Sequence, residues 1–341
     1  LRINSAKDDA AGLAISQRFT TQIRGMDQAA RNANDGISLA QTAEGALGSI
    51  GDNLQRIREL AVQSRNATNS ATDRAALNEE AKALKAEIDR VSAQTNFNGV
   101  KLLDGSFANQ VFQVGANQGE TITISSIANA NSSALGSYSR ATVTGTAATD
   151  LTAIAAGGLT INGTSVGAIG VAASATERAS QVRDAVNSVS GTSGVYAVAD
   201  TATTVSLVST TGNIAVAGAG TGAQSGLAAA TTNATTSTGF ASLDISTVAG
   251  ADAAMQSMDA ALTAVSTARA QLGAIQNRFS SVVSNLSTTS ENLSAARSRI
   301  QDADFAKESA ALTRTQILQQ AGTAMLAQAN QSASGVLSLI R

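Results

Sequence analysis

A long repeat of apolar and small residues near the C-terminal end limits what this chain can fold into more than any other feature. The repeat steps alternately by four and three residues over more than six heptads, and Thr289 is its one polar member. Such a seam is typical of coiled-coil packing rather than of an ordinary surface helix. Its positions are Met258, Leu262, Val265, Ala268, Leu272, Ile275, Phe279, Val282, Leu286, Thr289, Leu293, Ala296, Ile300 and Ala303.

A helix over this repeat would be roughly 70 Å long, which is about twice the width of a compact domain. A rod of that length cannot bury its seam inside a single globular core. It needs partner helices of similar length, so the repeat indicates a structural or assembly protein.

The composition excludes several function classes. The chain has 341 residues, of which 14% are charged, a formal net charge of -2, and no His or Cys. The commonest metal ligands, the usual general base and the thiol nucleophile are therefore missing, so we expect no enzyme, no metal site and no cofactor. The balance of charge predicts no nucleic-acid partner. No run of apolar residues is long enough for a membrane span, so no membrane partner is expected.

The chain also contains no Pro. An interior Pro destabilises a helix by about 3 kcal/mol, so long continuous helices exclude it. At an average usage of ~5%, a Pro-free chain of this length is hard to obtain by chance. The absence of Cys fits an extracellular bacterial protein without disulfides.

The patterns predict helical ends around a β-rich middle. Residues 1–138 form the N-terminal half of a helical bundle, with a β-hairpin near 110–125, and residues 250–300 form the C-terminal half. Residues 301–341 form a terminal helix that is thin in large apolar residues and stays mobile until another helix covers it. The expected fold class is mainly α, a long coiled-coil-like bundle built from both chain ends plus an outer α+β or β domain. On the N-terminal side the seam continues at Leu47, Ile50, Leu54 and Ile57.

Residues 139–249 form the variable outer domain, rich in Thr, Ala, Ser and Gly. Within it, 158–217 reads as a folded module with an Asn162-Gly163 hairpin turn and a helix that Ser174 and Glu177 cap. Residues 219–241 are expected to be a flexible connector.

Six motifs in the helical ends, together with two shorter stretches near the C-terminus, resemble signatures of bacterial flagellin, the subunit of the flagellar filament. The resemblance covers roughly residues 1–138 and 250–341. The motifs are Leu1 to Gly12, Arg31 to Ser38, Leu54 to Gln63, Gln94 to Gly99, Leu272 to Phe279 and Ala295 to Asp304, followed by Gln319 to Gly322 and the terminal Val336 to Arg341.

This resemblance implies an extracellular filament subunit that is exported without a cleaved signal peptide and polymerises with copies of itself. It also implies an export chaperone at the C-terminal helix, and filament cap and hook-associated proteins as partners. Flagellins carry a further helix before the Leu1 motif, so a first segment is expected to be missing. A chain without it should fold its bundle but polymerise poorly.

Flagellins with the 54–63 motif are recognised by the flagellin-sensing Toll-like receptor of animals. The resemblance assigns that role to Gln55, Arg56, Leu60 and Glu80, with exposed Arg56 beside apolar Leu60 as a hot-spot pair. The simpler interpretation is that Leu54, Ile57 and Ala61 fill the bundle while the polar residues face solvent. The paired carboxylates Asp8/Asp9 and Asp302/Asp304 are expected to cap helices or to meet Arg297 and Arg299. Two alternatives stay open: a hook–filament junction protein, and a surface adhesin or ligand-binding protein that uses the outer domain.

Overall fold

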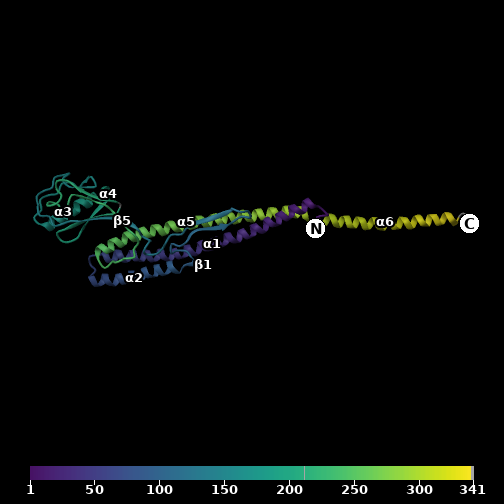
Figure 1. The fold of residues 1–341 in the computed structure, drawn as a ribbon, viewed down its shortest axis with the longest axis horizontal. Coiled ribbons are helices and arrows are strands. Elements are labelled where there is room, and N and C mark those ends of the chain that lie inside the picture. The colour runs from purple at the N-terminus through teal and green to yellow at the C-terminus, as the bar shows by residue number, and fades with distance from the viewer. Residues whose placement is uncertain (211, 339–341) are drawn as a thin grey trace. The chain divides into compact units, whose positions relative to one another are not determined.

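The computed structural model describes residues 1–210 and 212–338, and four long helices dominate it (Figure 1). They are α1 (Ala10–Arg65), α2 (Ala71–Gln94), α5 (Val248–Gln301) and α6 (Phe305–Ser338). The chain divides into two compact units. One comprises residues 1–37, 111–123 and 277–341, and the other comprises residues 38–110 and 124–276.

In the second unit, α1, α2 and α5 lie side by side and bury one shared apolar core (Figure 1). Two of the ion pairs that join α1 to α5 lie near the end of α1, where Arg58 Nε donates to Asp259 Oδ1 over 2.6 Å and Arg65 pairs with Asp252. The two arginines are seven residues apart, as are the two aspartates, and the helices run antiparallel. The core side chains, all at most 3% exposed, are Leu47, Ile50, Leu54, Ile57, Leu60, Ala81, Ile88, Met258, Val265 and Leu272.

The turn between α1 and α2 is held by a capping box that the sequence analysis does not predict. The Ser70 Oγ accepts the Asp73 backbone N–H at 3.2 Å, and the Asp73 carboxylate accepts the Ser70 N–H at 2.9 Å. Two donors at the start of α2 that have no helical partner are thereby satisfied. The adjoining Arg74 Nε donates to the Ser64 carbonyl at 2.9 Å, which ties α2 back to the end of α1.

After α2 the chain forms two antiparallel hairpins, β1 (Asn96–Phe97) with β2 (Val100–Lys101), and β3 (Ala108–Gln113) with β4 (Thr121–Ser126). The hairpin predicted near 110–125 is therefore present. The alternation also holds, because Ile122 and Ile124 are buried while Thr121 and Thr123 are exposed.

In the first unit, one aromatic side chain organises the packing. Phe279 of α5 is fully buried and lies against Gly36 of α1. Its ring meets that of Phe112 edge to face, with centroids 5.5 Å apart at 82°. Aromatic pairs prefer this geometry because the positive ring edge meets the negative face. At the far end of the same unit, the Arg2 backbone N–H donates to the Gln301 carbonyl at 2.7 Å.

The middle module, defined here as residues 138–237, contains two four-stranded sheets. The first has the order β11-β10-β6-β7 and the second β12-β5-β9-β8. Helices α3 (Ala175–Ser188) and α4 (Ser190–Ser193) complete the module. The strands are β5 (Tyr138–Thr144), β6 (Thr160–Ile161), β7 (Thr164–Ser165), β8 (Val195–Ala199), β9 (Val205–Ser209), β10 (Ile214–Ala217), β11 (Ala230–Thr232) and β12 (Thr235–Ser237).

Local signals in the middle module agree with the structure. Asn162 (φ 49°) and Gly163 (φ 77°) both adopt the left-handed conformation that a two-residue hairpin turn requires. Ser174 caps α3 by accepting the Glu177 N–H at 3.2 Å. The Glu177 carboxylate accepts from Ala173 N rather than from Ser174 N, so the cap is only half of the predicted box.

The expectation of a flexible connector over 219–241 is wrong. Strands β11 and β12 lie inside this stretch and pair with β10 and β5 respectively. The buried Leu227 belongs to the same apolar cluster as Ile154, Leu159 and Val182. Short strands of Thr and Ala give little periodic signal, because their pairing with distant strands stabilises them rather than their own side chains.

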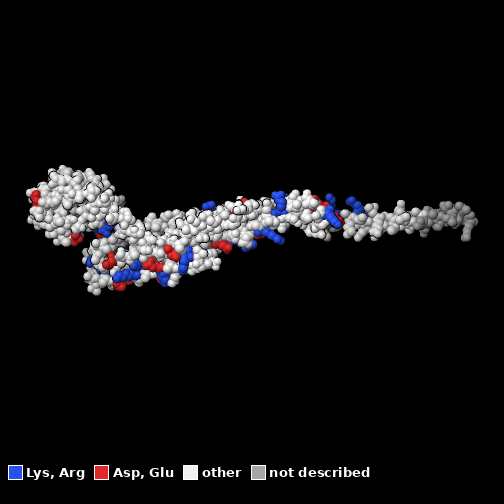
Figure 2. All heavy atoms as spheres, viewed as in Figure 1, with Lys and Arg blue, Asp and Glu red and all other residues white. Residues whose placement is uncertain are grey.

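Charge is distributed unevenly over the surface. Only eight residues between Arg140 and Gly250 are charged. On the face shown in Figure 2, blue and red atoms gather over the bundle helices and are sparse over the middle module. Among the described residues, no helix combines the length and the hydropathy that a membrane crossing requires.

Candidate interaction surfaces

Arg56 forms the centre of a polar surface that joins α1 to α2. Its Nη2 lies 2.8 Å from Glu80 Oε1, and its Nη1 lies 3.1 Å from Glu59 Oε2. The side chains of Arg56 and Glu80 are 47% and 45% exposed. The hydrogen bond with Glu80, followed by that with Glu59, raises the pKa of the Arg56 guanidinium. Because water screens the pair, it orients these side chains more than it stabilises the fold.

The four residues that the resemblance assigns to receptor recognition do not share one surface. Gln55, Arg56 and Glu80 are exposed, but Leu60 is 0% exposed and belongs to the bundle core. Of the expected hot-spot pair, Arg56 is therefore exposed, whereas the Leu60 side chain is buried in the bundle core. Leu60 lies on the seam side of α1, three residues after Ile57 and one before Ala61, both of which are also fully buried.

The bundle seam falls into two parts that differ in burial. Leu47, Ile50, Leu54, Ile57, Leu272 and Phe279 are at most 3% exposed. Within the same helices, Ile275, Val282, Leu286, Leu293 and Ile300 are only half-buried. From Val282 onward these residues belong to the first unit, which contains parts of α1 and α5. Helix α2 belongs to the other unit. A two-helix pair cannot enclose a seam on every side, so one flank of it stays accessible.

The terminal helix α6 leaves the large apolar side chains of residues 305–329 almost uncovered. Six large ones are between 60% and 86% exposed: Phe305, Leu312, Ile317, Leu318, Met325 and Leu326. Soluble monomers rarely expose contiguous apolar surface on this scale, and such surface marks a place of interaction. The predicted terminal Val336 to Ser338 lies within the helix, and residues 339–341 lie outside the described part of the chain.

Three of the four paired carboxylates, those of Asp8, Asp9 and Asp304, cap chain turns. Asp8 Oδ2 accepts the backbone N–H groups of Asn4 and Ser5 at 3.1 and 2.8 Å, which lowers the Asp8 pKa. Asp9 Oδ1 accepts the Gly12 N–H at 2.9 Å at the start of α1. Asp304 Oδ1 accepts from Ala306 and Lys307 at the start of α6. Across the described residues, no group of three His, Cys, Asp or Glu is placed to hold a metal ion.

Comparison with known proteins identifies both ends of the chain. Residues 1–108 match the family model of the bacterial flagellin N-terminal helical region, and residues 255–340 match that of the C-terminal helical region. The chain is 44% identical to Flagellin B of Vibrio cholerae over 348 residues, which covers 99% of this chain and 90% of that protein. It is 39% identical to the B-type flagellin of Pseudomonas aeruginosa, covering 100% of this chain and 93% of that protein.

A solved structure of a related flagellar protein shares the fold. The crystal structure of flagellar hook associated protein-3 from Legionella pneumophila aligns with a TM-score of 0.50 and 14% identity. The alignment covers 84% of this chain and 99% of that one. At this identity the likeness concerns the fold alone, so it does not favour the alternative of a hook–filament junction protein.

Proposed function

We propose that this chain, which belongs to the bacterial flagellin family, assembles by burying the exposed apolar side chains of α6 against other copies of itself. It is a non-enzymatic structural subunit of the flagellar filament. One observation carries this proposal. Six large apolar side chains of α6 are 60–86% exposed. A fully buried side chain of this kind contributes about 1.5–3 kcal/mol, so covering several of them is a strong driving force for association.

The half-buried part of the seam supports the same mechanism. Val282, Leu286 and Leu293 each retain exposed surface beyond the point where Phe279 is fully enclosed. An isolated helix with an uncovered apolar face gains little stability from its own sequence, because packing supplies most helical stability in proteins. Folding of α6 and assembly are therefore coupled, and the helix becomes fully ordered when a neighbouring copy covers it.

The test is the elongation of filament seeds by variants of α6. Ile317→Gln and Leu318→Gln replace exposed apolar side chains while keeping good helix formers. The matched control is Val171→Gln, which removes an apolar side chain that is 71% exposed in the middle module. We expect the two α6 variants to elongate seeds less than the unmodified protein does in electron micrographs, and the control to elongate them as much as the unmodified protein does. Equal elongation by all the variants would contradict this mechanism.

We further propose that the flagellin-sensing Toll-like receptor of animals recognises the surface formed by Gln55, Arg56 and Glu80. The support is that these side chains are exposed on adjoining helices and that Glu80 holds the Arg56 guanidinium in place over 2.8 Å. An oriented arginine loses less freedom on binding than a mobile one, which favours its use as a contact.

A receptor reporter assay with single variants tests this second proposal. Arg56→Ala should reduce signalling strongly, whereas Arg90→Ala should not. Arg90 is the matched control because it is similarly exposed and pairs with Glu87 on α2. Truncating the buried Leu60 to Ala would destabilise the bundle by about 2–5 kcal/mol, so Leu60→Met is the usable variant there. Unchanged signalling by Arg56→Ala would exclude this surface as the recognition site.

The remaining partners are proposed on the resemblance alone. The exposed face of α6 offers an export chaperone the same apolar side chains that assembly later covers. The filament cap and hook-associated proteins would meet the subunit in the assembled, extracellular filament. Co-purification of the chaperone with the unmodified protein but not with Ile317→Gln would support the first of these proposals.

A further inference from the structure

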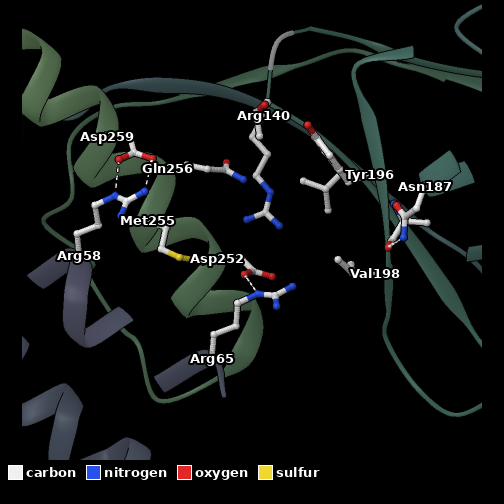
Figure 3. Close-up of a pocket in the computed structure, with 13 residues that line it drawn as sticks. Arg58, Arg65, Arg140, Asn187, Tyr196, Val198, Asp252, Met255, Gln256 and Asp259 are labelled. Atoms are coloured by element: carbon white, nitrogen blue, oxygen red, sulfur yellow. Dashed lines mark hydrogen bonds and ion pairs between the residues drawn. The ribbon is translucent and has the colours of Figure 1, made fainter. Parts of the chain in front are cut away.

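A pocket of about 450 Å³ lies between the end of α1, the first turns of α5 and the middle module, all within the unit of residues 38–110 and 124–276 (Figure 3). Ligand pockets in proteins usually have volumes of roughly 300–1,000 Å³. Its wall is mixed, with Tyr196, Val198 and Val208 contributed by the middle module and Met255 by α5. The pocket is therefore large enough for a small organic molecule and offers it both apolar and charged contacts.

The charges around the pocket do not balance. Arg58, Arg65 and Arg140 face Asp252 and Asp259, so the lining has one guanidinium more than it has carboxylates. Arg58 is paired with Asp259 and Arg65 with Asp252 (Figure 3). Arg140 is left over, and it forms no ion pair with any described residue. The lining thus lacks one negative charge.

Arg140 is also short of a hydrogen bond. Its Nε is buried and has no partner among the described residues, and the same is true of Gln256 Oε1 in the pocket wall. Figure 3 shows the Arg140 guanidinium pointing into the space between Gln256 of α5 and Tyr196 and Val198 of β8. A buried donor without a partner destabilises a protein, so such groups usually serve a purpose.

One further polar group in the wall, the Asn187 amide, is already engaged. The Asn187 amide donates to the Ala197 carbonyl at 3.0 Å and accepts the Ala197 N–H at 2.8 Å, so it is fixed in place. Tyr196 is half exposed and presents its ring and hydroxyl beside Arg140. The groups that remain for a ligand are the planar Arg140 cation, the Gln256 amide, one aromatic side chain and several apolar ones.

We propose that this pocket binds a small organic carboxylate, which Arg140 holds through its guanidinium while the body of the ligand packs against Tyr196, Val198 and Met255. Guanidinium and carboxylate match as two parallel hydrogen bonds, which gives both affinity and orientation. A single carboxylate supplies the one missing negative charge. Because its wall comes from both the bundle and the middle module, the bound ligand fixes one against the other.

Titration calorimetry of the full chain with four probes tests the proposal. The probes are benzoate, its neutral isostere benzamide, the acidic sugar N-acetylneuraminate, and sulfate. We expect benzoate or N-acetylneuraminate to bind and benzamide to bind at least about tenfold more weakly, because a charge-assisted hydrogen bond contributes about 1.5–3 kcal/mol. The stronger of the two carboxylates distinguishes an aromatic acid from an acidic sugar as the natural class of ligand.

Substitutions of Arg140 test whether this residue holds the carboxylate. Arg140→Gln should lose at least about tenfold in affinity for the carboxylate. Arg140→Lys, which keeps the charge but not the planar donor pair, should fall between it and the unmodified protein. Arg183→Gln is the matched control, since Arg183 lies on α3 of the same module, outside the pocket, and pairs with Asp184. Circular dichroism verifies that each variant is folded.

Three results would overturn the proposal. The first is that no carboxylate binds. The second is that sulfate binds and the carboxylates do not. The third is that Arg140→Gln and Arg140→Lys, both folded, bind as well as the Arg183→Gln control.

Discussion

The ring of Phe279 lies so close to Gly36 that a β-carbon at residue 36 would be 2.7 Å from the Phe279 Cζ atom. Protein side chains do not approach a ring at this distance, so the absence of a side chain at residue 36 is what allows α1 and α5 to enclose Phe279. This contact marks the point along α5 after which the seam is only half-buried.

The first prediction concerns this contact. Gly36→Ala should lower the free energy of unfolding by about 1–3 kcal/mol through overpacking. The control is Gly45→Ala on the same helix, where no atom lies within 4 Å of the added β-carbon. That change should stabilise the protein by about 0.5–1 kcal/mol because alanine restricts the unfolded chain. Urea denaturation measures the free energy of unfolding of both variants. A stabilising effect of Gly36→Ala would show that the Phe279 ring moves aside freely.

The second prediction concerns acid sensitivity at the start of α2. The hydrogen bonds from the Ser70 hydroxyl and backbone N–H hold the pKa of the Asp73 carboxyl below its ordinary value of 3.8. A depressed pKa in the folded state means that the carboxylate stabilises the protein above pH 3.8, and that this stabilisation disappears as the pH falls through the folded-state pKa. Asp73→Asn should therefore lower the Tm at pH 6 and have little effect at pH values well below 3.8.

The same measurement in a Ser70→Ala background provides the control. Removing the hydroxyl removes the largest cause of the shift, so the pH dependence of the Asp73→Asn effect should shrink. An effect of Asp73→Asn that is equally large at all pH values would argue against the capping box as its origin.

The third prediction concerns Asn78, which is buried on α2. Its Oδ1 accepts the Ile245 N–H at 2.9 Å, which anchors the segment that leads into α5. Asn78→Ala leaves that donor buried and unpaired, so it should destabilise the protein by about 1–3 kcal/mol. Asn292→Ala, at an exposed position of α5, is the control and should be neutral or slightly stabilising. Thermal unfolding followed by circular dichroism compares the two, and equal melting temperatures would show that water replaces the bond.

The fourth prediction concerns Arg178, a fully buried arginine on α3. Its Nη2 donates to the Leu151 and Thr152 carbonyls at 2.6 Å, while Nε and Nη1 have no partner among the described residues. Arg178→Met keeps most of the buried volume and should destabilise the middle module by about 1 kcal/mol. Arg178→Ala adds a cavity and should destabilise it by about 2–5 kcal/mol. Hydrogen exchange of the amides of β8 and β9 reports the difference, and the opposite order of the two variants would contradict this account.

The long helices and the fold class were predictable because their signals are local and repeated. The absence of Pro and the four-and-three spacing through Leu272 and Phe279 predict a long helix even before its partner helices are known. The Asn162-Gly163 turn was equally predictable, because Asn and Gly readily adopt the left-handed conformation that a two-residue hairpin turn requires. Strand β5 and the strands β11 and β12 were missed because non-local pairing stabilises them, as between Thr235 and Arg140.

The surfaces were less predictable than the fold. Sequence spacing places Arg56 and Leu60 on neighbouring turns of one helix, but it does not show on which side of the bundle each lies. The structure does, because the burial of Ile57 and Ala61 places Leu60 on the same side as the core. The pocket around Arg140 has no signal in the sequence at all. Its members come from four separate stretches of the chain and no motif connects them.

The ion pairs that Arg58 and Arg65 of α1 form with α5 have a consequence for alignment. A seam that repeats every seven residues fits almost equally well when one rod slides past the other by a heptad, so apolar contacts alone leave the offset ambiguous. Arg58 and Arg65 meet Asp259 and Asp252 together at a single offset, whereas a slip that brings Arg58 to Asp252 leaves Arg65 and Asp259 without partners. The charges thus select one offset between two helices whose apolar seams would allow several.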